Sequence, residues 1–421
     1  MTTLDALRAR TGGEVVGPGS VDYESRRGVF NARVDPAPAA LVACTGSEDV
    51  AHALSFARDR GLAVAVRGGG MSDAATVDGG VVIDVAALKD VHVDAENRTV
   101  RAGGGVTWAE LDEATQEHGL AVTGGRLSAL GVAGVALGSG AGWLERALGP
   151  TSDSLVAADV VLADGTVARA GLTEHAELLW ALRGGGPGSG VLTQLELRLH
   201  PVGPVILSGF LTYPRERASD VLRTYRDVMK DAPDEVIGGL TLFAGRAGPC
   251  TLAFGYLGDV QEGERILAPL RALRPSLDAV MPNEYRAFQS INDLSSPWGM
   301  RVQRSDAALR DLPDDALTAL AAAADVPAAT LSRVMLRPLG GAMSRRDREA
   351  SALEIPDAPW AYECVALWPP LPALDDGNIA WAGGVDNALA PYVQSAGQDD
   401  RAQRLRALRA RYDPGGVFTT R

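Results

Sequence analysis

The stretch Val66-Arg67-Gly68-Gly69-Gly70-Met71-Ser72 follows an apolar run, Leu62 to Val66, that has the composition of a β-strand. A second glycine-rich stretch, from 127 to 144, reads LSALGVAGVALGSGAGWL, and a third, from 183 to 190, reads RGGGPGSG. Glycine loses more backbone entropy on folding than any other residue, so such clusters need a physical reason. The usual reason is that bare backbone N–H groups approach a ligand closely, often a phosphate. The glycines therefore predict a phosphate-bearing cofactor, with purely structural turns as the alternative.

The common nucleotide-binding signatures are missing from these stretches. No G-x-x-x-x-G-K-[ST] sequence occurs, which argues against a P-loop protein. The run Gly138-Ser139-Gly140-Ala141-Gly142-Trp143 has tryptophan where a G-x-G-x-x-G motif would have its last glycine. The spacing therefore gives little support to a Rossmann domain, although several glycine loops could still hold a diphosphate.

Length and composition indicate a globular enzyme-like chain. The 421 residues are enough for about two domains, and 46% of them are apolar. Glycine is enriched, with 49 residues, against an average usage of about 7%. The net charge of −13 disfavours nucleic acid and anionic membranes as partners, and solubility is its simplest explanation. We expect a small-molecule substrate and no nucleic-acid or membrane partner, and the sequence does not define the oligomeric state.

The cysteines and the N-terminus bear on the compartment. The chain has three cysteines, Cys44, Cys250 and Cys364. This odd number and their spacing fit neither a disulfide framework nor a metal site. The first residues lack the apolar core of a signal peptide, and no apolar run is long enough to span a membrane. The sequence therefore predicts a cytoplasmic protein without a metal site.

The order of elements predicts an α+β fold. We expect an irregular lead-in over residues 1–38, followed by strands and helices with glycine loops at strand ends up to about residue 200. After that point strands alternate with helices, which suggests a sheet covered on one face. The strands expected there are 205–212, 239–243, 251–256, 331–336 and 361–367, and the helices 216–229, 262–273, 314–324 and 399–411.

Several ordered motifs carry a resemblance to a known family. The chain resembles the FAD-linked oxidases related to berberine bridge enzyme, within the vanillyl-alcohol-oxidase-like flavoproteins that have a PCMH-type FAD-binding domain. The resemblance is strong up to about residue 201 and holds in outline beyond it. The motifs that carry it are Pro38–Val42 with Ser47–Val50, Val66–Gly70, Leu137–Leu144, Asp153–Leu155, Val161–Gly165, Trp180–Gly186, and near the end Arg404-Leu405, Tyr412–Pro414 and Val417-Phe418.

The resemblance implies a fold, a domain division and a set of cofactor contacts. It implies an FAD-binding domain over 1–203 that is completed by 390–421, and a substrate domain over 204–389 built on an antiparallel sheet covered by helices. The pyrophosphate is expected on Arg67 to Ser72, and the flavin near Ser128 to Gly142 and Tyr392. The implied contacts are Arg67, Gly68, Gly69, Gly70, Met71, Ser72, Leu127, Ser128, Gly131, Gly134, Gly138, Gly140, Gly142, Val191 and Gln394.

The sequence departs from the family pattern at the residues that usually anchor the flavin. Many relatives have a histidine directly after Arg-Gly-Gly-Gly that bonds covalently to the flavin, and this chain has Met71. Some relatives add a cysteine before the Gly-Val-Ala-Gly run, where this chain has Leu127. Neither side chain can form those bonds, so we expect FAD to be held non-covalently, with Met71 pointing at the flavin edge.

Two functions remain open on these residues. In the first, the protein is an FAD-dependent oxidoreductase that oxidises a bulky secondary metabolite in a biosynthetic pathway, with a side-chain base that removes a proton. All five histidines precede residue 201, so the base would be a tyrosine or a carboxylate: Tyr392 first, then Tyr362 or Glu363. In the second, the scaffold catalyses a redox-silent cyclisation or rearrangement, because proximity and orientation alone lower a barrier. A non-enzymatic binding role is the remaining alternative.

Overall fold

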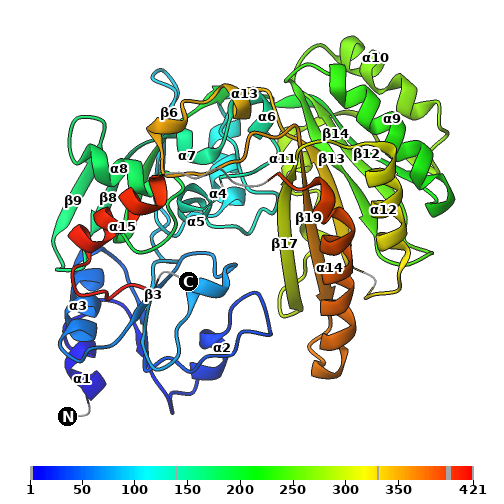
Figure 1. Cartoon of the computed structure of the whole chain (residues 1–421). Coiled ribbons are helices and arrows are strands. Elements are labelled where there is room, and N and C mark those ends of the chain that lie inside the picture. Colours follow the sequence, from blue (N-terminus) through cyan, green and yellow to red (C-terminus); the bar gives the residue numbers. More distant parts are fainter. Residues whose placement is uncertain (1–2, 139, 330, 395–399, 420–421) are drawn as a thin grey trace.

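The computed structural model describes residues 3–138, 140–329, 331–394 and 400–419. Figure 1 shows an α+β fold in which a four-stranded and a five-stranded sheet lie on one side of the molecule and an eight-stranded sheet lies on the other. A further sheet has two short strands. The fold class predicted from the sequence is confirmed. The smaller sheets use the chain up to about residue 200, and the large sheet uses the chain that follows.

The first sheet has four strands in the order β1-β2-β4-β3 and carries the first glycine loop. Its three parallel strands are short and apolar, and they are buried on both faces as parallel strands usually are. Helix α3 packs on the sheet and contributes Val50, Ala53 and Leu54 to its core. The bounds are β1 Val15–Val16, β2 Ala40–Ala43, α3 Ser47–Arg58, β3 Val64–Arg67 and β4 Val81–Asp84.

The second sheet is antiparallel, with the order β5-β6-β10-β8-β9. Helices α4, α5 and α8 contribute Leu111, Ala136 and Leu179 to the core that this sheet shares with them. The bounds are β5 Val91–Asp94, β6 Thr99–Gly103, α4 Trp108–Gln116, β7 Leu120–Ala121, α5 Val132–Leu137, α6 Glu145–Leu148, α7 Thr151–Ser154, β8 Leu155–Val161, β9 Val167–Gly171, α8 Ala176–Leu182, β10 Val191–Arg198 and β11 His200–Pro201.

The third sheet is antiparallel and has eight strands, in the order β15-β12-β14-β13-β18-β19-β17, with β16 paired to β12. Helices α9, α10, α12 and α14 cover one face of it (Figure 1). The bounds are β12 Val205–Tyr213, α9 Ala218–Asp231, β13 Val236–Phe243, β14 Cys250–Tyr256, α10 Val260–Arg271, β15 Leu277–Asp278, β16 Met281–Glu284, α11 Tyr285–Gln289, β17 Arg301–Leu309, α12 Asp314–Asp325, β18 Arg333–Pro338, α13 Ala342–Arg345, β19 Trp360–Trp368 and α14 Asp375–Leu389.

The C-terminal segment returns to the first half of the chain. Helix α15 (Arg401–Tyr412) packs on α8, where Leu408 and Trp180 share a small core. Beyond it, Val64 donates its backbone N–H to the carbonyl of Val417 at 2.7 Å, next to the first glycine loop. The end of the chain therefore supports the strand from which that loop starts.

Three parts of the sequence prediction need correction. The lead-in over 1–38 is not irregular, because it contains α1 (Thr3–Arg8), β1 and α2 (Tyr23–Arg27). Strand β17 was missed because one of its faces carries charged side chains, which hides the apolar alternation. Helix α14 was missed because it contains three glycines, which are poor helix formers. Within the described residues, no helix is long and apolar enough to cross a membrane.

Candidate functional site

A cavity of about 1000 Å³ lies between the glycine loops and the open face of the eight-stranded sheet. Its volume is at the upper end of the range for small-molecule and cofactor sites. One wall consists of the loop after β3, the segment around α5 and the loop Gly186–Gly190, and the opposite wall comes from strands β12, β13, β14, β17, β18 and β19. The three glycine stretches of the sequence thus meet at one site.

The loop after β3 offers a row of backbone donors. The N–H groups of Gly69, Gly70, Met71 and Ser72 donate to no acceptor among the described residues, and all four residues line the cavity. Gly70 has φ +67°, a conformation that glycine adopts without strain. Successive free N–H groups of this kind form an anion-binding concavity. This wall fits a diphosphate.

Glycine also sets the distance between the loop after β3 and the segment that precedes α5. A Cβ atom on Gly69 would lie 2.9 Å from the carbonyl oxygen of Ala129 and 2.9 Å from the nitrogen of Gly131, too close for either contact. On α5, Gly134 lines the cavity, and a Cβ atom there would meet nothing within 4 Å. A flat ligand can therefore approach the helix backbone at Gly134. The residues present fit a bound FAD at both its diphosphate and its ring.

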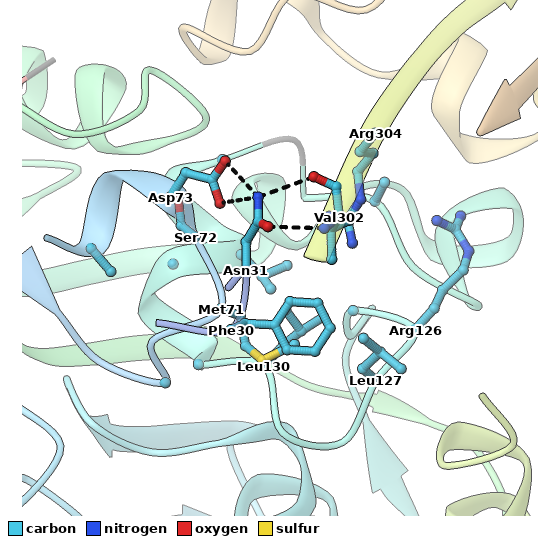
Figure 2. Close-up of a pocket in the computed structure, with 18 of the residues that line it drawn as sticks. Phe30, Asn31, Met71, Ser72, Asp73, Arg126, Leu127, Leu130, Val302 and Arg304 are labelled. Atoms are coloured by element: carbon cyan, nitrogen blue, oxygen red, sulfur yellow. Dashed lines mark hydrogen bonds between the residues drawn. The ribbon is translucent and has the colours of Figure 1, made fainter. Parts of the chain in front are cut away.

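Asn31 joins the glycine loop to the sheet. Figure 2 shows its amide between Asp73 and Val302. The amide nitrogen donates to both carboxylate oxygens of Asp73 and to the carbonyl of Val302, each at 3.2 Å. The amide oxygen accepts the N–H of Val302 at 2.9 Å. One buried side chain thus fixes the two walls of the cavity relative to each other.

Met71 and Leu127 both line the cavity. Met71 packs in an apolar cluster with Phe30, Val302 and Val365 (Figure 2). The residue after the three glycines therefore has apolar neighbours contributed by the sheet.

The alternation of side chains along each strand decides which residues of the sheet face the cavity. In one row across six strands, directly paired residues all face the cavity: Thr212, Thr251, Thr241, Met335, Glu363 and Asp306. The next row is Phe243, Arg333, Val365 and Arg304. The intervening residues face the covering helices, because successive side chains of a strand point to opposite faces.

Charged groups gather at the centre of this wall. Glu145, which is almost fully buried, accepts from Arg126 at 2.7 Å and from Arg337 at 2.5 Å. Burial lowers the pKa of Arg126, and Glu145 offsets part of that effect; a guanidinium nevertheless keeps its charge. Because Arg126 precedes α5 and Arg337 lies on β18, this ionic group also connects the two walls.

Glu363 lies beside these arginines. Burial by itself would raise its pKa, but the charges of Arg304, Arg126, Arg337 and Arg333 outweigh burial, and the pKa lies below its ordinary value. The nearest contact is from Arg304 Nε to Glu363 Oε1, at 3.4 Å. Glu363 is therefore an ionised carboxylate in the wall of the cavity.

The structure brings together most of the site residues expected from the sequence. Those that line the cavity are Glu363, Gly68, Gly69, Gly70, Met71, Ser72, Leu127, Gly131, Gly134 and Gly138.

Two predicted catalytic tyrosines do not reach the cavity. Tyr362 precedes Glu363 on β19 and so faces the helices, where its hydroxyl donates to Asp386 at 2.9 Å. Tyr392 packs against the core under the same helices. Of the three proposed bases, only Glu363 lines the cavity.

Six predicted cofactor contacts also lie outside the cavity lining: Arg67, Ser128, Gly140, Gly142, Val191 and Gln394. Arg67 pairs with Asp84, its neighbour on β4, at 2.6 Å. Ser128 bonds through its N–H and hydroxyl to Asp293.

The other four lie in backbone packing or in the core. A Cβ atom on Gly142 would collide with the carbonyl of Gly124, and Gly140 accepts from the N–H of Thr151. Val191 is fully buried in an apolar core, and Gln394 donates its N–H to Ala308.

Sequence reasoning missed the arginines and threonines of the sheet wall. Arginine on a strand is usually taken as solvent-exposed, so Arg304, Arg333 and Arg337 give no signal on their own. The available signal was their period of two along β17 and β18, which puts Arg304 with Asp306 and Arg333 with Arg337 on one face.

Comparison with known proteins agrees with this geometry. A family model described as FAD binding domain matches residues 38–171. The chain is 32% identical to (R)-6-hydroxynicotine oxidase of Paenarthrobacter nicotinovorans over 289 residues, which are 66% of this chain and 63% of that protein.

Solved structures extend the likeness to the whole chain. The structure of 6-hydroxy-D-nicotine oxidase from Arthrobacter nicotinovorans matches with a TM-score of 0.88 and 27% identity, covering 97% of each chain. The berberine-bridge-enzyme-like protein 1 of Physcomitrella patens has a TM-score of 0.87 over all of this chain and 98% of its own, and at 21% identity it shows a shared fold.

Proposed function

Because the chain belongs to the PCMH-type FAD-binding oxidases, a family of FAD-linked oxidoreductases, we propose that it oxidises a bulky small molecule with non-covalently bound FAD. The observation that carries this proposal is the cavity itself, which has a row of free backbone N–H groups on one wall and an ionised carboxylate on the other. Bound FAD would accept a hydride from the substrate. We propose the division into an FAD-binding part, 1–203 with 390–421, and a substrate part, 204–389.

The free N–H groups of Gly69 to Ser72 would hold the pyrophosphate, and Gly131, Gly134 and Gly138 would lie against the flavin. Leu127 and Met71 would contact the ring without bonding to it, because an alkyl group and a thioether do not form the bond that histidine or cysteine forms. The apolar cluster around Met71 supports this arrangement, since it would exclude water from the ring.

Glu363 is the group that would take the substrate proton. It is ionised at neutral pH and faces the cavity. Its low pKa makes it a weak base, so its contribution would depend on close contact with the substrate hydroxyl or amine. The threonines at 212, 241 and 251 would supply neutral hydrogen bonds to the rest of the substrate.

We propose a secondary metabolite (a polyketide, a glycoside or an alkaloid-like compound) as the substrate, in a biosynthetic pathway. The large cavity and its mixture of apolar, hydroxyl and charged groups support a substrate bigger than a simple alcohol.

A visible spectrum of the purified protein, before and after denaturation, tests the cofactor. Flavin absorbance that moves to the supernatant supports non-covalent FAD. A colourless protein that gains no thermal stability from added FAD would sink the proposal, because FAD at 100 times its Kd adds about 2.7 kcal/mol.

Anaerobic mixing with substrate then tests the reaction class. Bleaching of the flavin means that the substrate is oxidised. Product formation without bleaching would instead favour the redox-silent cyclisation or rearrangement on the same scaffold.

A further inference from the structure

Arg304 and Arg333 flank one apolar residue in the wall of the cavity. Val365 on β19 is paired directly with Arg304 on β17 and with Arg333 on β18, and all three line the cavity. Adjacent strands lie about 4.8 Å apart, so the two arginine Cα atoms are about 10 Å apart with Val365 between them. Their long side chains can both reach a group that lies over Val365.

Both guanidinium groups keep hydrogen-bonding capacity for a ligand. Arg304 has a side chain that is 48% exposed, and its one contact among the described residues is the 3.4 Å approach of Nε to Glu363. Arg333 donates to neutral oxygens, namely the carbonyls of Ser295 at 2.9 Å and Leu331 at 3.1 Å and the hydroxyl of Ser296 at 2.8 Å. Among the described residues no carboxylate forms an ion pair with Arg333.

The charges around the cavity do not cancel. Its lining carries five guanidinium groups, of Arg33, Arg126, Arg304, Arg333 and Arg337, and three carboxylates, of Asp73, Asp306 and Glu363. Glu145, which pairs with Arg126 and Arg337, adds a fourth carboxylate. One positive charge remains, in a cavity where water is partly excluded and electrostatic interactions are stronger than in bulk water.

We propose that the substrate carries a carboxylate, which binds over Val365 between Arg304 and Arg333. The proposal rests on the proposed function, because it takes the sheet side of the cavity as the substrate site. The planar fork of a guanidinium matches a carboxylate in two-point hydrogen bonding. A single negative charge neutralises the positive charge that remains around the cavity, whereas a phosphate dianion would reverse its sign. Phe243 and Met335 lie beside this position and suit an apolar body attached to the carboxylate.

Calorimetric titration of the FAD-loaded protein with three probes tests this inference. Benzoate carries the proposed group, benzamide is its neutral analogue, and phenyl phosphate carries the alternative anion. We expect benzoate to bind at least about tenfold more tightly than benzamide and more tightly than phenyl phosphate. Equal binding of benzoate and benzamide, or no saturable binding of benzoate at millimolar concentrations, would overturn the proposal. Tighter binding of phenyl phosphate would overturn the choice of carboxylate.

Variants locate the binding position. Arg304→Gln and Arg333→Gln should each reduce benzoate affinity about tenfold and leave benzamide affinity unchanged, while Arg304→Lys should retain part of the preference. Arg246→Gln is the matched control, because Arg246 is 91% exposed and lies outside the cavity lining. Unchanged benzoate affinity in Arg304→Gln contradicts the proposal, and that variant decides the question if Arg333→Gln does not fold.

Calorimetry needs no flavin signal, so the same titration can be repeated on protein without FAD, and the two proposals can fail separately. A protein that binds benzoate selectively but never takes up FAD would disprove the proposed function alone. A flavoprotein that oxidises a neutral substrate and ignores benzoate would disprove this inference alone.

Discussion

Asn31 and Val302 form a reciprocal pair across the cavity, in which the side-chain amide of Asn31 both donates to and accepts from the backbone of Val302. The two residues are 271 positions apart in the chain, and the same amide also holds Asp73 beside the glycine loop. Asn31 therefore connects the glycine loop to the sheet, and its loss should affect both stability and cofactor binding.

Asn31→Ala should destabilise the protein and weaken FAD binding. The substitution leaves the buried backbone N–H of Val302 without its acceptor, which costs about 1–3 kcal/mol. It also removes the hydrogen bonds from Asn31 to Asp73, while the Val302 carbonyl keeps its bond from Arg33. Urea unfolding and fluorescence titration with FAD measure the two effects. Asn97→Ala is the control, because Asn97 lies in an exposed hairpin and hydrogen-bonds to Asp94, and it should change FAD affinity little. An unaltered FAD affinity in Asn31→Ala would show that the bridge does not support the loop.

Gly69→Ala should reduce FAD affinity by about tenfold or more. The new Cβ atom would press on Ala129 and Gly131 at 2.9 Å and so move apart the two segments proposed to hold the diphosphate and the ring. Gly28→Ala is the control, because Gly28 has a φ of −65° and open space around it. Equal FAD affinities for the two variants would count against the proposed cofactor position.

Met71→His should create a covalent flavin fraction, while the unmodified protein releases all of its flavin on acid precipitation. The reason is the position of Met71, directly after the glycine loop in the cavity wall. Flavin fluorescence of the washed, unfolded protein on a gel measures the fraction. Met300→His is the matched control from the same apolar cluster, and it should carry no covalently bound flavin. Flavin that stays with the unmodified protein would refute non-covalent binding.

Glu363→Gln should lower kcat by about 100-fold or more and leave FAD binding intact, as expected for loss of a general base. Because its pKa lies below the ordinary value, the activity of the unmodified protein should not change between pH 8 and 6 through this group. Tyr362→Phe is the control on the neighbouring position. It removes a hydrogen bond to Asp386 on the opposite face of the strand, which costs about 1 kcal/mol of stability, and it should not affect turnover. A larger loss of turnover in Tyr362→Phe than in Glu363→Gln would reverse the assignment.

Asp112 should make stability fall as pH rises. It is buried on α4, one carboxylate oxygen has no partner among the described residues, and burial raises its pKa to about 8. Between the ordinary aspartate pKa and about 8, the folded protein holds a proton that the unfolded chain has lost, so the free energy of unfolding decreases with pH.

In the Asp112→Asn variant no proton has to be taken up at this position on folding. The melting temperature of the variant should therefore exceed that of the unmodified protein at pH 8.5, and the difference should shrink toward pH 4. Thermal unfolding followed by circular dichroism across this range measures the effect. Asp90→Asn, at an exposed position, is the control. Parallel stability curves for the unmodified protein and Asp112→Asn would contradict the prediction.

Much of the fold could be predicted from the sequence. Strands such as β3 and β4 are short apolar runs, helices such as α9 have a clear apolar stripe, and the glycine motifs occur in a fixed order. These signals are local, because periodicity and turn chemistry act within a few residues. The glycine loops were found from such local signals and Met71 from the family resemblance, and they lie in the cavity.

The sheet wall was not predictable in the same way. Whether Tyr362 or Glu363 faces the cavity depends on which face of β19 the helices cover, and a shift of one residue reverses the answer. The sequence alone determined the glycine loops, because each is a continuous segment with its own backbone requirement. Only the tertiary structure decided which charges meet there, because Arg126, Arg304, Arg333 and Glu363 come together through strand pairing and through contacts between distant segments.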